Sequence, residues 1–206
     1  WTAEDMDRFA WEAVRQDQAH VADGMWLAAC TGMRRADLVS VRRAQVYEYA
    51  IIKKALKKSR GKRRTATMPR IPELDSLLEE LEGRPRAEGV ETVLVNSFGQ
   101  PWSGDGYGGS FNRIRDKAGI AHVDEETGEE RRKHLHDLRG TFCTKLILAG
   151  LTDQEAADVM GWSPERVGRI RRVYVDQSRV VVAIGERIAT GTVNRIVNRS
   201  DGDTEN

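Results

Sequence analysis

Helical apolar patterns that end at a glycine take up most of this chain, and they constrain its fold more than any other feature. Within them apolar residues recur at three- and four-residue spacing, which is the pattern of a helix with one buried face. Glycine is common at helix ends because it adopts left-handed backbone angles at little cost. The glycines that end these patterns are Gly32, Gly83, Gly119, Gly150 and Gly161. The chain is therefore predicted to be mainly helical.

The predicted helices also begin at recognisable signals. Thr2 can cap the first helix, Pro72 suits the first turn of another, and Thr152 forms a capping box with Glu155. Helices are expected near residues 2–14, 21–31, 33–38, 72–83, 111–118, 138–149, 152–160 and from 164 onward, followed by an amphipathic stretch at 180–188.

A β-hairpin is predicted between the third and fourth helices. Residues 46–52 are rich in β-branched and aromatic side chains, and residues 65–68 can form the antiparallel return strand around a turn at 59–62. A short extended piece is expected at 93–95, and residues 124–133 are expected to form a surface loop. The predicted fold class is mainly α with a small antiparallel β-sheet, that is, α+β.

The chain has 206 residues, enough to bury a hydrophobic core. One domain is expected over residues 1–190, and residues 191–206 are expected to form a disordered tail. No apolar run approaches the roughly 20 residues that span a bilayer, and the first residues lack the features of a signal peptide. We therefore expect a cytoplasmic protein without a membrane partner. Cys30 and Cys143 are isolated in the sequence and are expected to be buried, reduced thiols.

Charge is distributed unevenly, although the net charge is only +1. Every charged residue in one segment is basic: Lys53, Lys54, Lys57, Lys58, Arg60, Lys62, Arg63, Arg64 and Arg70. A second basic cluster consists of Arg166, Arg169, Arg171 and Arg172. Acidic residues gather elsewhere, at 124–126, at 129–130 and in the tail. This asymmetry favours a polyanion such as nucleic acid on one face, whereas a solvated charged loop is the simpler alternative for either cluster alone.

Four separated motifs matter together. They are Thr31-Gly32-Met33-Arg34-Arg35-Ala36-Asp37-Leu38, the basic hairpin, Leu135-His136-Asp137-Leu138-Arg139-Gly140-Thr141-Phe142, and Met160-Gly161-Trp162 followed by Arg172-Val173-Tyr174. This set and its order resemble the tyrosine recombinase (phage integrase) family, over the chain from Trp1 to about Ala189. The most specific parts are the arginine in its Thr-Gly-Met-Arg context, the His-x-x-Arg pair and the late tyrosine. The resemblance implies the fold of that family's catalytic domain.

Two arginines suit phosphoryl transfer at a DNA diester. The reaction develops negative charge on the non-bridging oxygens, and a guanidinium offers those oxygens a planar, permanently charged fork. Arg34 and Arg139 are the candidates for this role. A structural ion pair of Arg34 with Asp37 is the alternative, and in either case Asp37 is a supporting residue.

His136 stands three residues before Arg139, so both can lie on one side of a helical turn. A free tyrosine has a pKa of about 10, so a tyrosine nucleophile must lose its proton as it attacks, and His136 is the expected acceptor. Tyr174 is the predicted nucleophile, and a 3′-phosphotyrosine with a free 5′-hydroxyl is the predicted intermediate. This chemistry requires no metal and no cofactor. A packed surface aromatic is the alternative for Tyr174.

The remaining assignments follow from the resemblance. In that family a hairpin lysine protonates the leaving 5′ oxygen, and matching Lys58-Ser59 to the usual Lys-Thr step selects Lys58, with Lys57 and Lys62 left open. Trp162 stands where many members carry histidine, and its indole can donate a hydrogen bond but cannot shuttle a proton. The residues expected to hold DNA phosphates are Lys57, Arg60, Lys62, Arg63 and Arg64.

The predicted function is a site-specific DNA recombinase or integrase that cleaves and rejoins DNA strands. The resemblance implies double-stranded DNA as partner, a tetramer on DNA held by the C-terminal segment, and accessory DNA-bending or directionality proteins in a bacterial, archaeal or phage setting. The resemblance implies an N-terminal DNA-clamping domain, which we expect to be absent from this chain, so weak DNA affinity in isolation is expected. The alternatives are type IB topoisomerase-like strand cleavage and a non-catalytic DNA-binding regulator. The long step from Trp162 to Tyr174 leaves open whether Tyr174 attacks in its own active site or in a neighbour's.

Overall fold

The computed structural model describes residues 1–56, 64–124, 126–175 and 177–191. Its helices are α1 (Ala3–Arg15), α2 (Ala19–Thr31), α3 (Arg35–Val39), α4 (Pro72–Glu82), α5 (Gly104–Lys117), α6 (Leu138–Leu148), α7 (Asp153–Met160), α8 (Pro164–Tyr174) and α9 (Gln177–Gly191). Two short 3-10 helices, η1 (Arg43–Gln45) and η2 (Leu135–Asp137), precede β1 and α6. Among the helices within these ranges, none is both long and apolar enough to cross a membrane.

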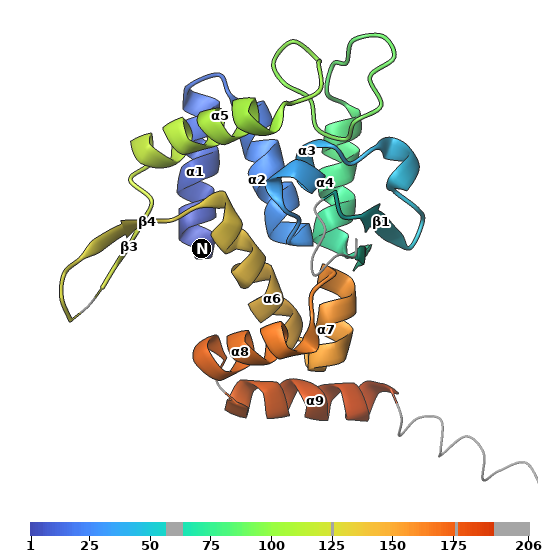
Figure 1. Cartoon of the computed structure of the whole chain (residues 1–206), viewed down its shortest axis with the longest axis vertical. Helices are drawn as coiled ribbons and strands as arrows, with labels where there is room; N and C mark the ends of the chain where they lie inside the picture. Colours follow the sequence, from blue (N-terminus) through green and yellow to red (C-terminus); the bar gives the residue numbers. More distant parts are fainter. Residues whose placement is uncertain (57–63, 125, 176, 192–206) are drawn as a thin grey trace, which may run out of the picture.

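Two antiparallel hairpins complete the fold. β1 (Ala50–Lys54) pairs with β2 (Thr65–Pro69), so that Ala50 lies opposite Pro69 and Lys54 opposite Thr65. β3 (Ala121–Val123) pairs with β4 (Glu130–Arg132), and this hairpin stands out from the body of the molecule (Figure 1). The predicted fold class, mainly α with a small antiparallel sheet, is confirmed.

Two predictions about extended segments are wrong. The first strand begins at Ala50, later than predicted, because the Tyr47 N–H donates to the Ala50 carbonyl (2.8 Å) and the chain turns between them. Residues 124–133 are not a plain loop, since β4 lies within them and pairs with β3. The Asp124 carboxylate accepts the Thr127 N–H (2.8 Å) and closes a tight turn. Short, largely exposed strands without apolar alternation do not reveal such a hairpin in the sequence.

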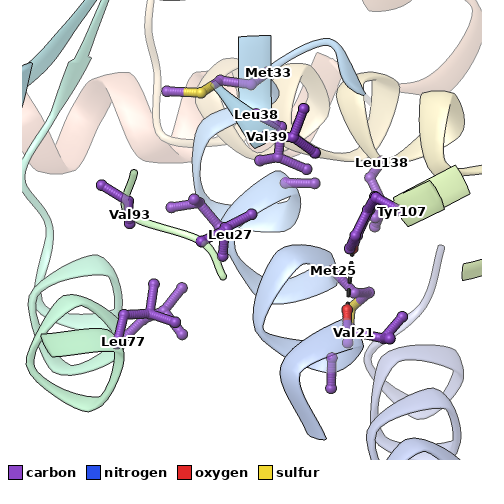
Figure 2. Close-up of a cluster of buried hydrophobic side chains, with 14 of the residues drawn as sticks. Val21, Met25, Leu27, Met33, Leu38, Val39, Leu77, Val93, Tyr107 and Leu138 are labelled. Carbon is purple, nitrogen blue, oxygen red and sulfur yellow. Dashed lines mark hydrogen bonds between the residues drawn. The ribbon is translucent and has the colours of Figure 1, made fainter. Parts of the chain in front are cut away.

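Two hydrophobic clusters make up the core. The larger one lies among α1, α2, α4 and α5 and includes Tyr107, whose buried hydroxyl donates to the Val21 carbonyl at 3.0 Å (Figure 2). The smaller one is formed by α6, α7, α8 and the loop that carries Trp162. α6 belongs to both, because Leu138 at its start packs in the larger cluster and Phe142, one turn later, packs in the smaller one. The junction of the two clusters therefore lies at the start of α6 (Figure 1).

Gly32 brings the end of α2 into this junction. Its backbone is left-handed (φ 60°), a conformation that glycine adopts readily. A Cβ at this position would lie 2.7 Å from Phe142 Cδ1 and 2.9 Å from Met160 Cε, so a larger residue would push α2 away from α6 and α7. Arg34 follows two residues later as the N-cap of α3. The Thr-Gly-Met-Arg motif thus places an arginine where the two clusters meet.

Candidate active site

The predicted site residues that the structure describes surround two cavities at this junction. The larger cavity has a volume of about 740 Å³, and its walls include His136, Arg139, Trp162 and Arg166. The smaller cavity has a volume of about 20 Å³, which is room for about one water molecule. Its walls include Arg34, Asp37, Lys53, Arg64 and Arg139. Arg139 lines both cavities and is the centre of the arrangement.

Arg139 is a buried cation without an anionic partner among the described residues. It is 3% exposed, and its Nε and Nη2 atoms are buried with no hydrogen-bond partner in that part of the chain. Burial, together with the charges of Arg34 and Arg166, lowers the pKa of Arg139 to about 9. Burying an unpaired charge is costly, so buried guanidinium groups normally have an acid beside them. An anion bound in the larger cavity would supply that partner.

Arg34 and Arg166 increase the positive charge around Arg139. Arg34 is half-buried on the wall of the smaller cavity, and Arg166 projects from α8 onto the wall of the larger one. Burial lowers the pKa of Arg166, and the charge of Arg34 lowers it further. The ion pairs within residues 1–56, 64–124, 126–175 and 177–191 include neither of these two arginines. Three guanidinium groups therefore act on one small region.

The acids that line the described walls of the two cavities bind backbone groups instead. Asp37 is buried, and its carboxylate accepts the Leu56 N–H at 2.8 Å, which anchors the base of the β1–β2 hairpin. Asp137 accepts the His134 N–H at 2.8 Å and caps η2. Neither carboxylate forms an ion pair with the three arginines, so the positive charge stays available to a ligand.

Trp162 contacts two of these arginines. It is 4% exposed, and the Cζ atoms of Arg166 and Arg139 lie 4.0 Å and 5.1 Å from the centre of its ring, within cation–π range. The Trp162 indole N–H is buried and has no hydrogen-bond partner in the described part of the chain. Arg64, just before β2, donates to the backbone carbonyl of Trp162, which ties the hairpin to the site. Because the indole only donates, it can offer its N–H to an anion but cannot carry a proton.

His136 is exposed on the wall of the larger cavity. It belongs to η2, which leads directly into α6, so His136 and Arg139 face the same space. Partial burial and the charges of Arg139 and Arg166 lower the pKa of His136, against a smaller opposing effect of Asp137. The imidazole is therefore neutral near pH 7, which is the form that accepts a proton.

Several predicted residues lie outside the described part of the chain. They are Lys57, Lys58, Arg60, Lys62 and Arg63, all within residues 57–63. Tyr174 is the last residue of α8, and its side chain is also outside the description. The next residue, Val175, is buried in the smaller cluster, so the backbone beside Tyr174 is held against the helices that form the site.

The sequence pattern indicates no specific role for Arg166. The signal was the basic cluster of α8, but its arginines are spread around the helix, and the pattern cannot show which of them faces the site. Arg171, for example, pairs with Asp153 at 2.7 Å instead. Lys53 was also not singled out; it is buried in β1 and donates to the Ser40 carbonyl at 2.8 Å, which gives it a structural partner.

The sequence matches the model of the phage integrase family over residues 3–178. The chain belongs to this family. The family predicted from the four motifs is thereby confirmed. A comparison with curated proteins found no match.

Solved structures of integrases share the fold. A lambda integrase dimer bound to a COC′ core site matches with a TM-score of 0.62 and 19% identity, over 78% of this chain and 56% of that one. The Tn1549 transposon integrase in complex with circular intermediate DNA matches with a TM-score of 0.63 and 19% identity, over 85% of this chain and 60% of that one. The lambda integrase catalytic core matches with a TM-score of 0.61 and 18% identity, over 78% of this chain and 89% of that one. At these identities the likeness establishes the fold alone, and the chain spans little more than half of the first lambda integrase chain.

Proposed function

We propose that this chain is the catalytic domain of a site-specific DNA recombinase that cleaves and rejoins DNA strands through a 3′-phosphotyrosine intermediate. The observation that carries the proposal is the buried guanidinium of Arg139, which forms no ion pair with a carboxylate among the described residues and lies beside Arg34 and Arg166. A DNA phosphodiester is the anion whose shape and charge suit several guanidinium groups at once. Membership of the phage integrase family supports the same class of reaction.

Arg34 and Arg139 hold the non-bridging oxygens of the scissile phosphate in this mechanism. The charge on those oxygens grows as the nucleophile adds, so donors that are already in place lower the barrier without rearranging. Arg166 adds a third positive charge, and the Trp162 ring keeps two of the guanidinium groups in position. The cost of burying Arg139 without a partner disappears when the phosphate binds.

Tyr174 supplies the nucleophile. Its hydroxyl oxygen attacks the phosphorus, the bond from phosphorus to the 5′ oxygen breaks, and neutral His136 accepts the phenolic proton. The 5′ oxygen leaves as a hydroxyl after taking a proton from a hairpin lysine, for which Lys58 is the candidate and Lys57 and Lys62 are the alternatives. The same steps in reverse, with the 5′-hydroxyl of another strand, rejoin the DNA. The phosphotyrosine bond conserves the energy of the diester, so the cycle needs no ATP.

The proposal includes a tetramer on DNA, joined through the C-terminal helix. α9 carries Val181, Val182 and Ile188, which are 67%, 61% and 54% exposed. Aliphatic side chains that share one helix and remain this exposed are suited to burial against another surface. One solved structure that shares the fold is a lambda integrase tetramer bound to a Holliday junction, with a TM-score of 0.64 and 19% identity. That assembly supports the same arrangement here.

A nicked suicide duplex that carries the attachment site tests the reaction. After cleavage the short 5′ fragment diffuses away, and the protein stays covalently attached to the 3′ end. The wild-type protein should give an adduct that survives denaturing electrophoresis, and Tyr174→Phe should give none. Tyr49→Phe is the control, because Tyr49 is an exposed tyrosine stacked on Tyr47 and lines neither of the two cavities at the candidate site.

Two results would refute the mechanism: no adduct with the wild type, or an equal yield with Tyr174→Phe. A synapsis assay with two attachment sites then separates recombination from topoisomerase-like cleavage, which acts at a single site.

A further inference from the structure

A third cavity, of about 380 Å³, adjoins the candidate active site. His136 lines both this cavity and the large one, so the two spaces meet at the predicted base. We call it the Arg35 cavity. Its polar lining consists of Arg35, Asn112, His134 and His136. Among the described residues that line it there is no carboxylate.

Gly108 admits the Arg35 guanidinium to this cavity. A Cβ added at Gly108 would lie 3.2 Å from Cζ of Arg35 and closer still to its Nη1 atom, so the guanidinium rests directly on the backbone of α5. Arg35 also bonds Asp105 at 3.2 Å, but the Asp105 side chain is 99% exposed. An ion pair between solvent-exposed groups contributes little free energy, so Asp105 competes only weakly with a ligand for the Arg35 guanidinium.

Arg115 fixes two further groups as hydrogen-bond donors. It is 4% exposed, and its Nη1 atom contacts the Asn112 Oδ1 atom at 2.9 Å and the His134 Nδ1 atom at 3.4 Å. Arginine only donates, so Asn112 presents its oxygen here. Nη1 also lies 3.3 Å from the Lys133 carbonyl, and the His134 ring nitrogen that faces this guanidinium is the unprotonated one, because an N–H there would point at another donor. Nδ2 of Asn112 and Nε2 of His134 therefore remain N–H donors, and neither has a hydrogen-bond partner in the described part of the chain.

A cation with two N–H donors and no carboxylate is the chemistry of an anion site. The position of the Arg35 cavity beside the candidate active site indicates which anion it binds. Arg34 and Arg35 are consecutive, yet Arg34 lines the cavity that holds Arg139 and Arg35 lines the one beyond His136. Phosphates also follow one another along a DNA strand, at about 3.4 Å of helix axis for each nucleotide.

We propose that the Arg35 cavity binds a second DNA phosphate, the one next to the scissile phosphate on the same strand. This inference rests on the proposed function. Arg35, Asn112 and His134 fix the register of the strand, so that the phosphate beside Arg139 is the one that reacts. Gly108 is required because it leaves room for Arg35.

Neutral phosphates test the proposal. One phosphate next to the scissile one is replaced by a methylphosphonate, on the 5′ side in one duplex and on the 3′ side in another. The wild-type protein should bind one of these duplexes about tenfold more weakly than the unmodified duplex, because one charge-assisted contact is lost. Arg35→Ala should bind the unmodified duplex about tenfold more weakly and should be insensitive to that same methylphosphonate.

Two glycines of α5 provide a matched pair of variants. Gly108→Ala places a methyl group where the Arg35 guanidinium lies, and it should reproduce the weaker binding of Arg35→Ala. Gly109→Ala meets open space and should bind DNA like the wild type. Both changes raise the helix propensity of α5 equally, so a difference between them reports on the Arg35 cavity, which Gly108 lines and Gly109 does not.

The proposal is wrong if Arg35→Ala binds with wild-type affinity, or if both methylphosphonates weaken the wild type and Arg35→Ala alike. Inorganic phosphate tests whether the anion bound in the Arg35 cavity is a phosphate of DNA or a free phosphate ion. If it raises the Tm of the wild type but not of Arg35→Ala while neither methylphosphonate has an effect, the cavity binds free phosphate and the assignment to DNA is wrong. Failure of the proposed function looks different, because the wild type would form no covalent adduct, whereas these binding measurements need no cleavage.

Discussion

Replacing Arg139 by methionine should stabilise the DNA-free protein while abolishing strand cleavage. The pKa of Arg139 is lowered from its ordinary value to about 9, so keeping its charge in the folded state costs about 5 kcal/mol. Because the folded-state pKa is the lower one, this cost is present in full at any pH below about 9. Methionine fills similar aliphatic space without the charge, and it loses a cation–π contact with Trp162 of about 1–2 kcal/mol.

The net gain should be about 3 kcal/mol, which for a domain of this size raises the Tm by about 6–12 °C. Thermal unfolding followed by circular dichroism at pH 7 without DNA measures the gain. The same variant should form no adduct on the suicide duplex, because the phosphate loses its central donor.

Arg115→Met is the matched control. Arg115 is 4% exposed, so it is as buried as Arg139, but it pairs with Asp116 at 2.7 Å and donates to Asn112 at 2.9 Å. Its removal should lower the Tm, because partners inside the protein lose their donor. If Arg139→Met unfolded below the wild-type temperature, Arg139 would have a stabilising partner within the protein, and the argument for a bound phosphate would fail.

Three further predictions concern the site and its support. Because the pKa of His136 is lowered, the rate of cleavage should stay unchanged as the pH falls to below the ordinary histidine value of about 6.5. Arg166→Met removes one of the charges that lower this pKa, so in single-turnover assays the rate should begin to fall at a higher pH. If the pH at which the rate falls did not move, His136 would not be the base. Gly32→Ala should lower the free energy of unfolding in urea by about 2–4 kcal/mol, because the new methyl group overlaps Phe142. Gly109→Ala is the control and should not lower it, because its methyl group meets open space. If Gly32→Ala were as stable as Gly109→Ala, the contact of α2 with α6 would be able to shift. Trp162→Phe should slow adduct formation about tenfold, because it removes the indole N–H, which has no partner in the described part of the protein. The smaller buried ring should also lower the Tm modestly, and an unchanged rate would exclude that N–H from the reaction.

The helices were predictable because their signals are local. The left-handed angles at Gly32 and Gly161, and the capping box of Thr152 with Glu155, are each formed within a few residues of sequence. The exposed β3–β4 hairpin was missed for the opposite reason, since its strands bury no alternating apolar face and an Asp124 side chain alone closes its turn. Motif order was enough to predict the family, because Thr-Gly-Met-Arg and His-x-x-Arg each occur at their expected place in the chain.

The sequence alone thus determined most of the helices, although α5 begins at Gly104 and not near residue 111, together with the fold class, the family and the residues proposed to react. Only the tertiary structure decided their surroundings. No local pattern shows that Arg139 forms no ion pair among the described residues, that Arg166 rather than Arg171 reaches the Trp162 ring, or that Gly108 makes room for Arg35. Periodicity specifies which face of a helix is buried, whereas the partner of a buried charge depends on packing between segments far apart in the chain.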